Sequence, residues 1–377
     1  MNKALPPQIQ PCSRRALLKM STFAALAAAV SLSGCQSQTA PLTVYLLERA
    51  IPATLLKAFS RQFGPANLER KAQISGLFEQ LQRFADGTPG PTLLSLGDYW
   101  LQAAIQNQLI RPLSEAQLSG WSRLPQAWQQ LVTRNEVGEV AEAGEIWGAP
   151  YRTGQLVMLY RPERIAPDKL PKDWSDLWRG DLAGKVTMLD SARTVIGLVL
   201  QAMGRDPNTA ALDQVPGLAD RLTALHRQVR LYSSQAYLQP LIIEDAWLAV
   251  GWSTDILPLA RRNPRLAIAV PESGTLTTSD VWVQPSAADD SELTAQWIRF
   301  FWQPETAVRF SLLGSGVSPI LLGQPREDLP LGLQTDSALL PSQATIQRSA
   351  ALLPLAPEVA ERYRALWAST RREAASA

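Results

Sequence analysis

The content of cysteine and histidine limits the chemistry that this 377-residue chain can perform. The sequence has one histidine, His226, and two cysteines, Cys12 and Cys35. Histidine-rich metal sites need more histidines than the chain supplies, and a catalytic thiol would have to be Cys12 or Cys35, both near the N-terminus. The sequence also contains no G-x-S-x-G, P-loop or G-x-G-x-x-G pattern. We therefore expect a protein that is not an enzyme and that holds no metal or other cofactor.

Aromatic residues provide a second chemical signal. The chain has 12 tryptophans, and Trp100, Trp252 and Trp282 lie near the ends of expected strands or beside polar clusters. In open α/β sheets, ligands bind outside the carboxyl ends of the strands. Aromatic faces at that place stack on planar groups or hold cations. We therefore expect each of these tryptophans either to contact a ligand or to pack in the core.

The run SRRALLKMSTFAALAAAVSLSGC, residues 13–35, has the parts of an export signal. Its apolar part, residues 20–34, is shorter than the roughly 20 residues that a transmembrane helix needs. A basic head, a short apolar region and a small-residue end are typical of a secretory signal. The pair Arg14 and Arg15 resembles a twin-arginine signal, and the ending LSGC resembles a lipobox with Cys35 as the lipidated residue. We predict an export signal at 1–34, a tether at 35–40, and a periplasmic, lipid-anchored protein.

Removal of the signal changes the charge of the chain. Residues 1–34 hold four basic residues and no acidic one, so the 36 basic residues become 32, against 34 acidic residues. No basic surplus remains that would indicate a nucleic-acid partner. Cys35 is then the only cysteine, so the fold must be stable without a disulfide.

The hydrophobic pattern alternates between strands and helices. Apolar runs predict strands at 42–47, 91–97, within 145–161, at 185–189, at 246–252 and at the end of 260–271. Helical spacing predicts helices at 53–63, 98–108, 190–204 and 356–374, and two helices separated at Pro304. This alternation is typical of an α/β protein with a parallel sheet. His226 lies beside the apolar stripe of an amphipathic helix, which favours a surface or boundary role.

The stretch WSDLWRGDLAGKVTMLDSARTVIGLVLQAMG, residues 174–204, has the most specific pattern in the chain. It is similar to the corresponding stretch of the bacterial spermidine/putrescine-binding proteins of polyamine ABC transporters. The resemblance extends over most of residues 42–325 and includes IWGAPYRTGQLVML, AWLAVGWSTDILPLARR and TLTTSDVWVQP. It implies a two-lobe periplasmic-binding-protein fold of type II, with a ligand cleft between the lobes. Lobe 1 would comprise 41–155 plus 279–325, and lobe 2 would comprise 156–278 plus 326–377. The implied partners are a small-molecule solute and an ABC permease, and we expect a monomer.

The resemblance also indicates ligand-binding positions. Trp252 would stack on the apolar part of a polyamine, Tyr99 would form a second wall, and Asp280, preceding the return strand, would pair with an ammonium group. Asp280 could instead be a turn residue. Where the family has acids at a helix start and aromatic residues after the first strand, this chain has other residues. The complete predicted set is Tyr99, Trp252, Asp280, Ser191, Thr194, Asp190 and Glu48.

These replacements leave alternatives for the ligand. Hydroxyl groups at a helix N-terminus, with Arg193 alongside, accept an anion or a neutral polar group. The same fold could therefore bind a different small polar or anionic solute, or serve as a sensor or scaffold lipoprotein that does not transport. Convergence of at least two carboxylates in the cleft would favour a polyamine.

Overall fold

The computed structural model describes residues 42–85, 90–289 and 291–376. The predicted export signal, the tether and Cys35 lie outside the described residues. Within the described ranges, no helix is long and apolar enough to cross a membrane.

The N-terminal part forms three parallel strands with helices packed on them. Strand β1 (Thr43–Leu47) pairs with β2 (Asn67–Lys71) on one side and with β3 (Leu93–Gly97) on the other. Helices α3 (Ala53–Phe63), α4 (Ile74–Ala85) and α5 (Leu101–Gln106) bury their apolar faces. The predictions for 42–47, 53–63 and 91–97 are confirmed. Strand β2 was not predicted, because its sequence NLERK is mostly polar and lies at the sheet edge.

The C-terminal part repeats this arrangement. Strand β8 (Val186–Met188) lies between β9 (Val229–Tyr232) and β10 (Leu248–Trp252), parallel to both. Helix α7 (Ala192–Ala202) begins at its N-cap Ser191, and Gly204, with a φ of 66°, allows the chain to leave the helix. The predicted strands at 185–189 and 246–252 and the helix within 190–204 are confirmed. The other helices here are α8 (Leu218–Gln228), α9 (Gln239–Ile242), α10 (Ser253–Arg262) and α15 (Pro357–Ser376).

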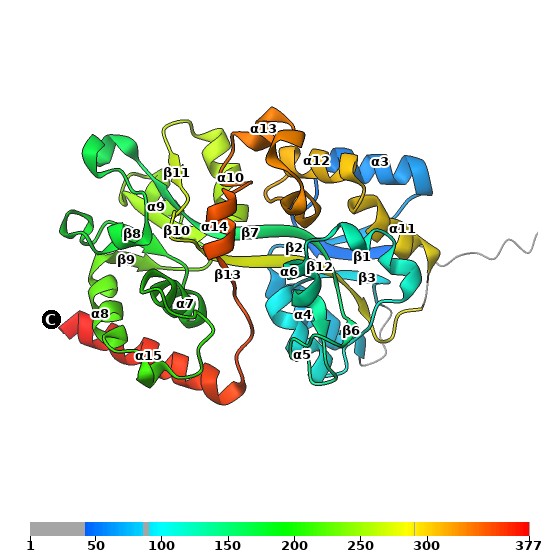
Figure 1. Cartoon of the computed structure of the whole chain (residues 1–377), viewed down its shortest axis with the longest axis horizontal. Coiled ribbons are helices and arrows are strands. Elements are labelled where there is room, and N and C mark those ends of the chain that lie inside the picture. The colour runs from blue at the N-terminus through cyan, green and yellow to red at the C-terminus, as the bar shows by residue number, and fades with distance from the viewer. Residues whose placement is uncertain (1–41, 86–89, 290, 377) are drawn as a thin grey trace, which may run out of the picture. The chain divides into compact units, whose positions relative to one another are not determined.

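Two long antiparallel strands join the two parts. Strand β7 (Ala149–Tyr160) pairs with β10 on one edge and with β12 (Leu276–Pro285) on the other, and β12 in turn pairs with β3. The resulting strand order is β2-β1-β3-β12-β7-β10-β8-β9. Figure 1 shows β7 and β12 running side by side from the part with β8–β10 to the part with β1–β3. We call these two parts the C-terminal and the N-terminal lobe.

Smaller elements complete the described fold. Beside β12 or β7 lie β4 (Ile110–Arg111), β11 (Ala267–Ala269) and β13 (Ala350–Ala351), and β5 (Thr133–Arg134) pairs with β6 (Glu145–Ile146). Two helices separated at Pro304 are confirmed as α11 (Glu292–Phe301) and α12 (Pro304–Leu313). The remaining α-helices are α6 (Gln126–Val132), α13 (Leu331–Gln334) and α14 (Gln343–Arg348).

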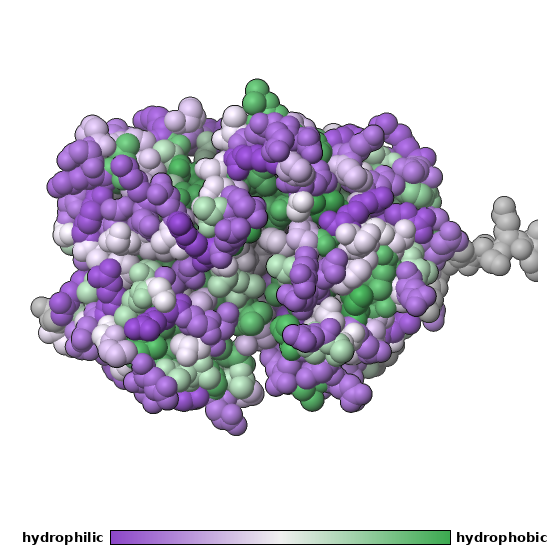
Figure 2. All heavy atoms as spheres, in the orientation of Figure 1, coloured by the Kyte–Doolittle hydropathy of each residue, from purple (hydrophilic) through white to green (hydrophobic). Residues whose placement is uncertain are grey.

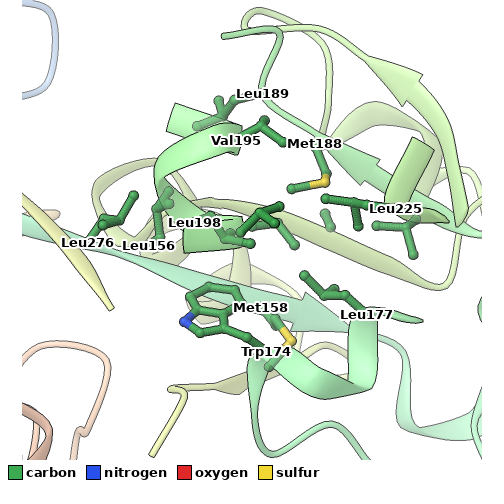
Figure 3. Packing of buried hydrophobic residues seen from close by; sticks show 14 of the residues in the cluster. Leu156, Met158, Trp174, Leu177, Met188, Leu189, Val195, Leu198, Leu225 and Leu276 are labelled. Carbon is green, nitrogen blue, oxygen red and sulfur yellow. The ribbon is translucent and has the colours of Figure 1, made fainter. Parts of the chain in front are cut away.

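Each lobe has its own hydrophobic packing. In the C-terminal lobe, Val195 and Leu198 of α7 pack with Leu156 and Met188 of the sheet (Figure 3). The N-terminal lobe contains an aromatic cluster in which Trp282 is fully buried and stacks on Tyr151 at a centroid distance of 4.0 Å. Side chains of residues 329–340 pack in this cluster, whereas those of 352–367 pack in the C-terminal lobe. The C-terminal segment therefore contacts both lobes, and the predicted lobe boundaries stay a prediction.

His226 is buried, so the expectation of a surface or boundary position was wrong. Its Nδ1 lies 2.7 Å from the Tyr232 hydroxyl and its Nε2 lies 3.1 Å from Thr370 Oγ1. The ring also packs edge-on against Trp367 of α15. Burial, together with the charge of Arg371, lowers the pKa of His226 to about 4. The histidine is therefore a neutral packing residue that docks α15 on α8.

The packing of α7 predicts a specific loss of stability. Leu198 is 1% exposed, and Leu198→Ala should lower the free energy of unfolding by about 2–5 kcal/mol, because it removes buried methyl groups and leaves a cavity. Urea denaturation followed by tryptophan fluorescence measures this change. The control is Leu313→Ala, at a leucine that is 58% exposed, where we expect a change within about 0.5 kcal/mol. Equal effects of the two substitutions would contradict the assigned packing.

Candidate functional site

A cavity of about 140 Å³ lies against the two crossing strands. Residues from both lobes line it: Ser253 at the start of α10 belongs to the C-terminal lobe and Asp98, directly after β3, to the N-terminal lobe. Helix α6 and the segment around α14 close the other sides, and Figure 1 shows α14 between the lobes near β7 and β13. The same face in Figure 2 is mainly hydrophilic, and hydrophobic residues reach its surface near the middle. The apolar lining includes Trp128, Leu131, Val317, Leu322, Leu339 and Ile346.

Two buried polar atoms of the cavity lining have no hydrogen-bond partner among the described residues. One is Asp98 Oδ2; the other carboxylate oxygen of Asp98 accepts from the Tyr99 backbone N–H and from Thr278 Oγ1, both at 2.9 Å. The second is Gln155 Oε1, whose amide nitrogen donates to the carbonyl oxygens of Ser337 and Ala338. Leaving a buried acceptor unpaired costs about 1–3 kcal/mol. Both atoms are acceptors, so a ligand that carries N–H groups would satisfy them.

Asp98 is also electrostatically unusual. It is 1% exposed, and its burial raises its pKa to about 7, although hydrogen bonds from Thr278, Ser279 and Tyr99 and the charge of Arg134 act in the opposite direction. The carboxyl group is therefore partly protonated near neutral pH. Asp98 was not predicted as a site residue. Its position directly after a buried strand and before Tyr99 was the signal that could have found it.

Asp280 has a partner within the protein. The Arg152 Nε–H donates to Asp280 Oδ2 at 2.6 Å, and Arg152 Nη2 forms an ion pair with the same oxygen. Arg152 Nη1 also donates to Ser315 Oγ at 3.0 Å. Asp280 lies inside β12 in register with Arg152 of β7, so the expected places before the return strand or in a turn were both wrong.

Tyr99 lies beside Asp280. A Cβ atom placed on Gly97 would be 2.7 Å from Tyr99 Cε1, so the Tyr99 ring packs over Gly97, which is in register with Asp280. The absence of a side chain at Gly97 thus makes room for the ring. Tyr99 remains 37% exposed. The structure therefore brings two of the predicted residues together.

A further carboxylate, Asp255 of α10, faces the Arg152–Asp280 pair. The Asp255 side chain reaches solvent, but the protein packed around it disfavours the charged carboxylate. This desolvation, together with the charge of Asp280, raises the pKa of Asp255. The charge of Arg152 and a 3.2 Å hydrogen bond from Tyr237 Oη act in the opposite direction. Such a combination is typical of a group in a concave surface. Asp255 and Asp280 therefore lie close enough to interact electrostatically beside the crossing strands, and Asp98 is the one of the three carboxylates that lines the cavity.

Of the three tryptophans singled out in the sequence, Trp252 is the one next to the cavity, whereas Trp128, which was not singled out, lines it. It is half-buried at the end of β10, and the following residue, Ser253, lines the cavity. Trp282 is fully buried in the N-terminal lobe, and Trp100 stacks on Phe78, so both have packing roles.

None of the seven predicted site residues is among the residues that line this cavity. Ser191 Oγ accepts the Thr194 backbone N–H at 3.2 Å as the cap of α7, and Asp190 pairs with Arg371 at 3.2 Å. Glu48 is exposed after β1. The role of all seven residues in ligand binding stays a prediction. Arg193 donates to the carbonyl oxygens of Leu353 and Pro207, so its guanidinium does not support the anion hypothesis.

Comparison with known proteins assigns the class. Residues 92–335 match the family of bacterial extracellular solute-binding proteins, and the chain belongs to this family. It is 22% identical over 313 residues to spermidine/putrescine-binding periplasmic protein 1 of Haemophilus influenzae, covering 81% of this chain and 83% of that protein. It is also 22% identical to a putrescine/cadaverine-binding protein of Pseudomonas aeruginosa, with 91% and 97% coverage. The predicted family resemblance is confirmed.

Solved structures show the same fold. The spermidine/putrescine ABC transporter substrate-binding protein of Streptococcus pneumoniae superposes with a TM-score of 0.78 at 20% identity, covering 89% of this chain and 99% of that chain. A putative spermidine/putrescine ABC transporter protein of Listeria monocytogenes gives a TM-score of 0.69 at 20% identity, with 88% and 99% coverage. The predicted α/β two-lobe periplasmic-binding-protein fold is confirmed. Within the described part of this chain, no group of three or more His, Cys, Asp or Glu side chains could hold a metal ion.

The burial of Asp98 predicts a pH dependence of stability. Because the folded state binds the Asp98 proton more tightly than the unfolded state does, the free energy of unfolding should fall as the pH rises from about 4 to about 7. The full contribution is on the order of 4 kcal/mol. Asp98→Asn should remove this slope, as measured by urea denaturation of the ligand-free protein at several pH values. Asp190→Asn, at a half-exposed carboxylate, is the control, and an unchanged slope in Asp98→Asn would refute the assignment.

Proposed function

We propose that the chain is the extracytoplasmic substrate-binding protein of an ABC transporter of the polyamine type, and that it binds its solute in the cavity between the lobes. Membership in the solute-binding family and relatives named as spermidine- and putrescine-binding proteins support this function. The partner is then an ABC permease, and the protein is a monomeric carrier without catalytic activity. An anionic solute is less favoured for two reasons: Arg193 already donates to backbone carbonyl oxygens, and carboxylates near the cavity would repel an anion.

The observation that carries the proposal is the match between the cavity and an amine. The unpartnered buried atoms, Asp98 Oδ2 and Gln155 Oε1, are both hydrogen-bond acceptors. A protonated polyamine carries only donors, and its methylene groups suit apolar walls such as Trp128 and Leu339. An anion would instead place acceptors against acceptors.

We further propose that the protein is exported and held at the membrane by a lipid on Cys35. The order of a twin-arginine pair, a short apolar region and LSGC before Cys35 supports this. The names of the relatives as periplasmic proteins agree with the location.

Titration calorimetry with putrescine, spermidine, citrate and sulfate tests the solute class. We expect the amines to bind and the anions not to bind. At a pH of about 8, Asp98→Asn should weaken amine binding on the order of tenfold, because it removes a charge-assisted hydrogen bond. Glu361→Gln, at an exposed position of α15, should bind like the parent protein. Binding of an anion without binding of an amine would rule out the polyamine class.

Replacement of Cys35 tests the anchor. In cells that express the full chain, Cys35→Ser should move the protein from the membrane fraction to the soluble fraction and abolish labelling with a radioactive fatty acid. Cys12→Ser is the matched control and should keep both properties, since Cys12 lies within the predicted signal. Retention of the label in Cys35→Ser would contradict the proposed lipidation.

A further inference from the structure

Arg152 places a positive charge next to a cavity whose proposed ligand is itself positive, because the following residue of β7, Thr153, lines that cavity. Its side chain lies on crossing strand β7 and is only 9% exposed. All three guanidinium nitrogens have partners: Nε and Nη2 contact Asp280 Oδ2, and Nη1 donates to Ser315 Oγ. The guanidinium is therefore held in a fixed position rather than free to swing into solvent.

The contacts leave Asp280 only half available. Both Arg152 donors use Oδ2, and within the described part of the chain no hydrogen bond is made to Oδ1. The Asp280 side chain is 14% exposed, so a ligand can reach the carboxylate. An ammonium group bound there would share Asp280 with Arg152 and would lie close to a like charge.

The charges around the pair limit how many ammonium groups the site can compensate. Asp255 and Asp280 both act electrostatically on Arg152. With both carboxylates ionised, the two acids and the one guanidinium have a formal net charge of −1. Putrescine carries two ammonium groups and spermidine three. Without Arg152, the same two carboxylates would match a ligand with two charges.

We propose that Arg152 is a specificity-determining residue that acts as an internal counter-ion of Asp280 and biases the site toward amines with fewer positive charges. The proposal rests on the proposed function, because it concerns the amine site of a solute-binding protein. Arg152 lowers the affinity for each additional ammonium group in two ways: it occupies one oxygen of Asp280, and it repels the ligand. A ligand that displaced Arg152 from Asp280 would leave a poorly exposed guanidinium without its partner, which is costly.

The test is calorimetry of Arg152→Met with three amines that differ in charge: N-acetylputrescine with one, putrescine with two and spermidine with three. We expect Arg152→Met to raise the affinity for spermidine on the order of tenfold or more relative to N-acetylputrescine, because a full carboxylate becomes available. Arg152→Lys keeps the charge and should keep the selectivity of the parent protein. Arg152→Gln, which retains a donor for Asp280 without the charge, serves if Arg152→Met does not fold.

A double variant separates charge selection from a structural role. Arg152→Met with Asp280→Asn should lose the gain in spermidine affinity, because the freed carboxylate is gone. If Arg152→Met and Arg152→Gln weaken all three amines equally, Arg152 only links β7 to β12 and the proposal is overturned. If the folded parent protein and all variants bind none of the amines, the proposed function fails, and the proposal fails with it. Thermal unfolding of each variant confirms that it is folded.

Discussion

The pairing of β7 with β12 is the constraint on which the rest of the structure depends. Each of these strands pairs along one edge with the other, and along its second edge it pairs antiparallel with a strand of one lobe, β10 or β3. The register therefore fixes both lobes and the groups between them at once. Arg152 faces Asp280 across this pair, and the register shift directly after Asp280 marks a bulge, a feature that re-aims side chains next to functional sites.

Strand β7 contains polar residues although every one of its positions is buried. A strand chosen for stability alone would be apolar, because each buried polar group must find a partner. Arg152 and Thr153 find theirs in β12, but Gln155 keeps one unpartnered oxygen that faces no donor in the described part of the chain. Gln155 and Asp98 each leave one acceptor oxygen without a hydrogen bond at the same cavity. A bound ligand would supply the missing donors, which explains why these oxygens are left without a partner inside the protein.

Local patterns allowed the sequence to predict the long apolar strands and amphipathic helices, such as 42–47 and 53–63, and a resemblance along the chain predicted the two-lobe fold. Contacts between distant residues were not accessible in this way. Asp280 was expected to meet a ligand, but its partner Arg152 lies 128 positions away and depends on the strand register. His226 was placed near the surface because its helix is amphipathic, whereas Thr370, 144 positions away, covers it. Tyr99 and Trp252 could be found because they follow predicted strands directly.

The three carboxylates around the crossing strands have different electrostatic roles. Asp280 carries a fixed internal counter-ion, whereas Asp98 is partly protonated near neutral pH because burial opposes its charge. An ammonium group next to Asp98 would favour the ionised form, so amine binding at this residue displaces a proton. Ionising Asp98 therefore offsets part of the free energy gained from the new ion pair. As a consequence, the affinity for an amine rises with pH through the range in which Asp98 titrates. Arg152 and the Asp98 proton thus limit cation affinity by two independent means, one set by sequence and one by the pH of the surroundings.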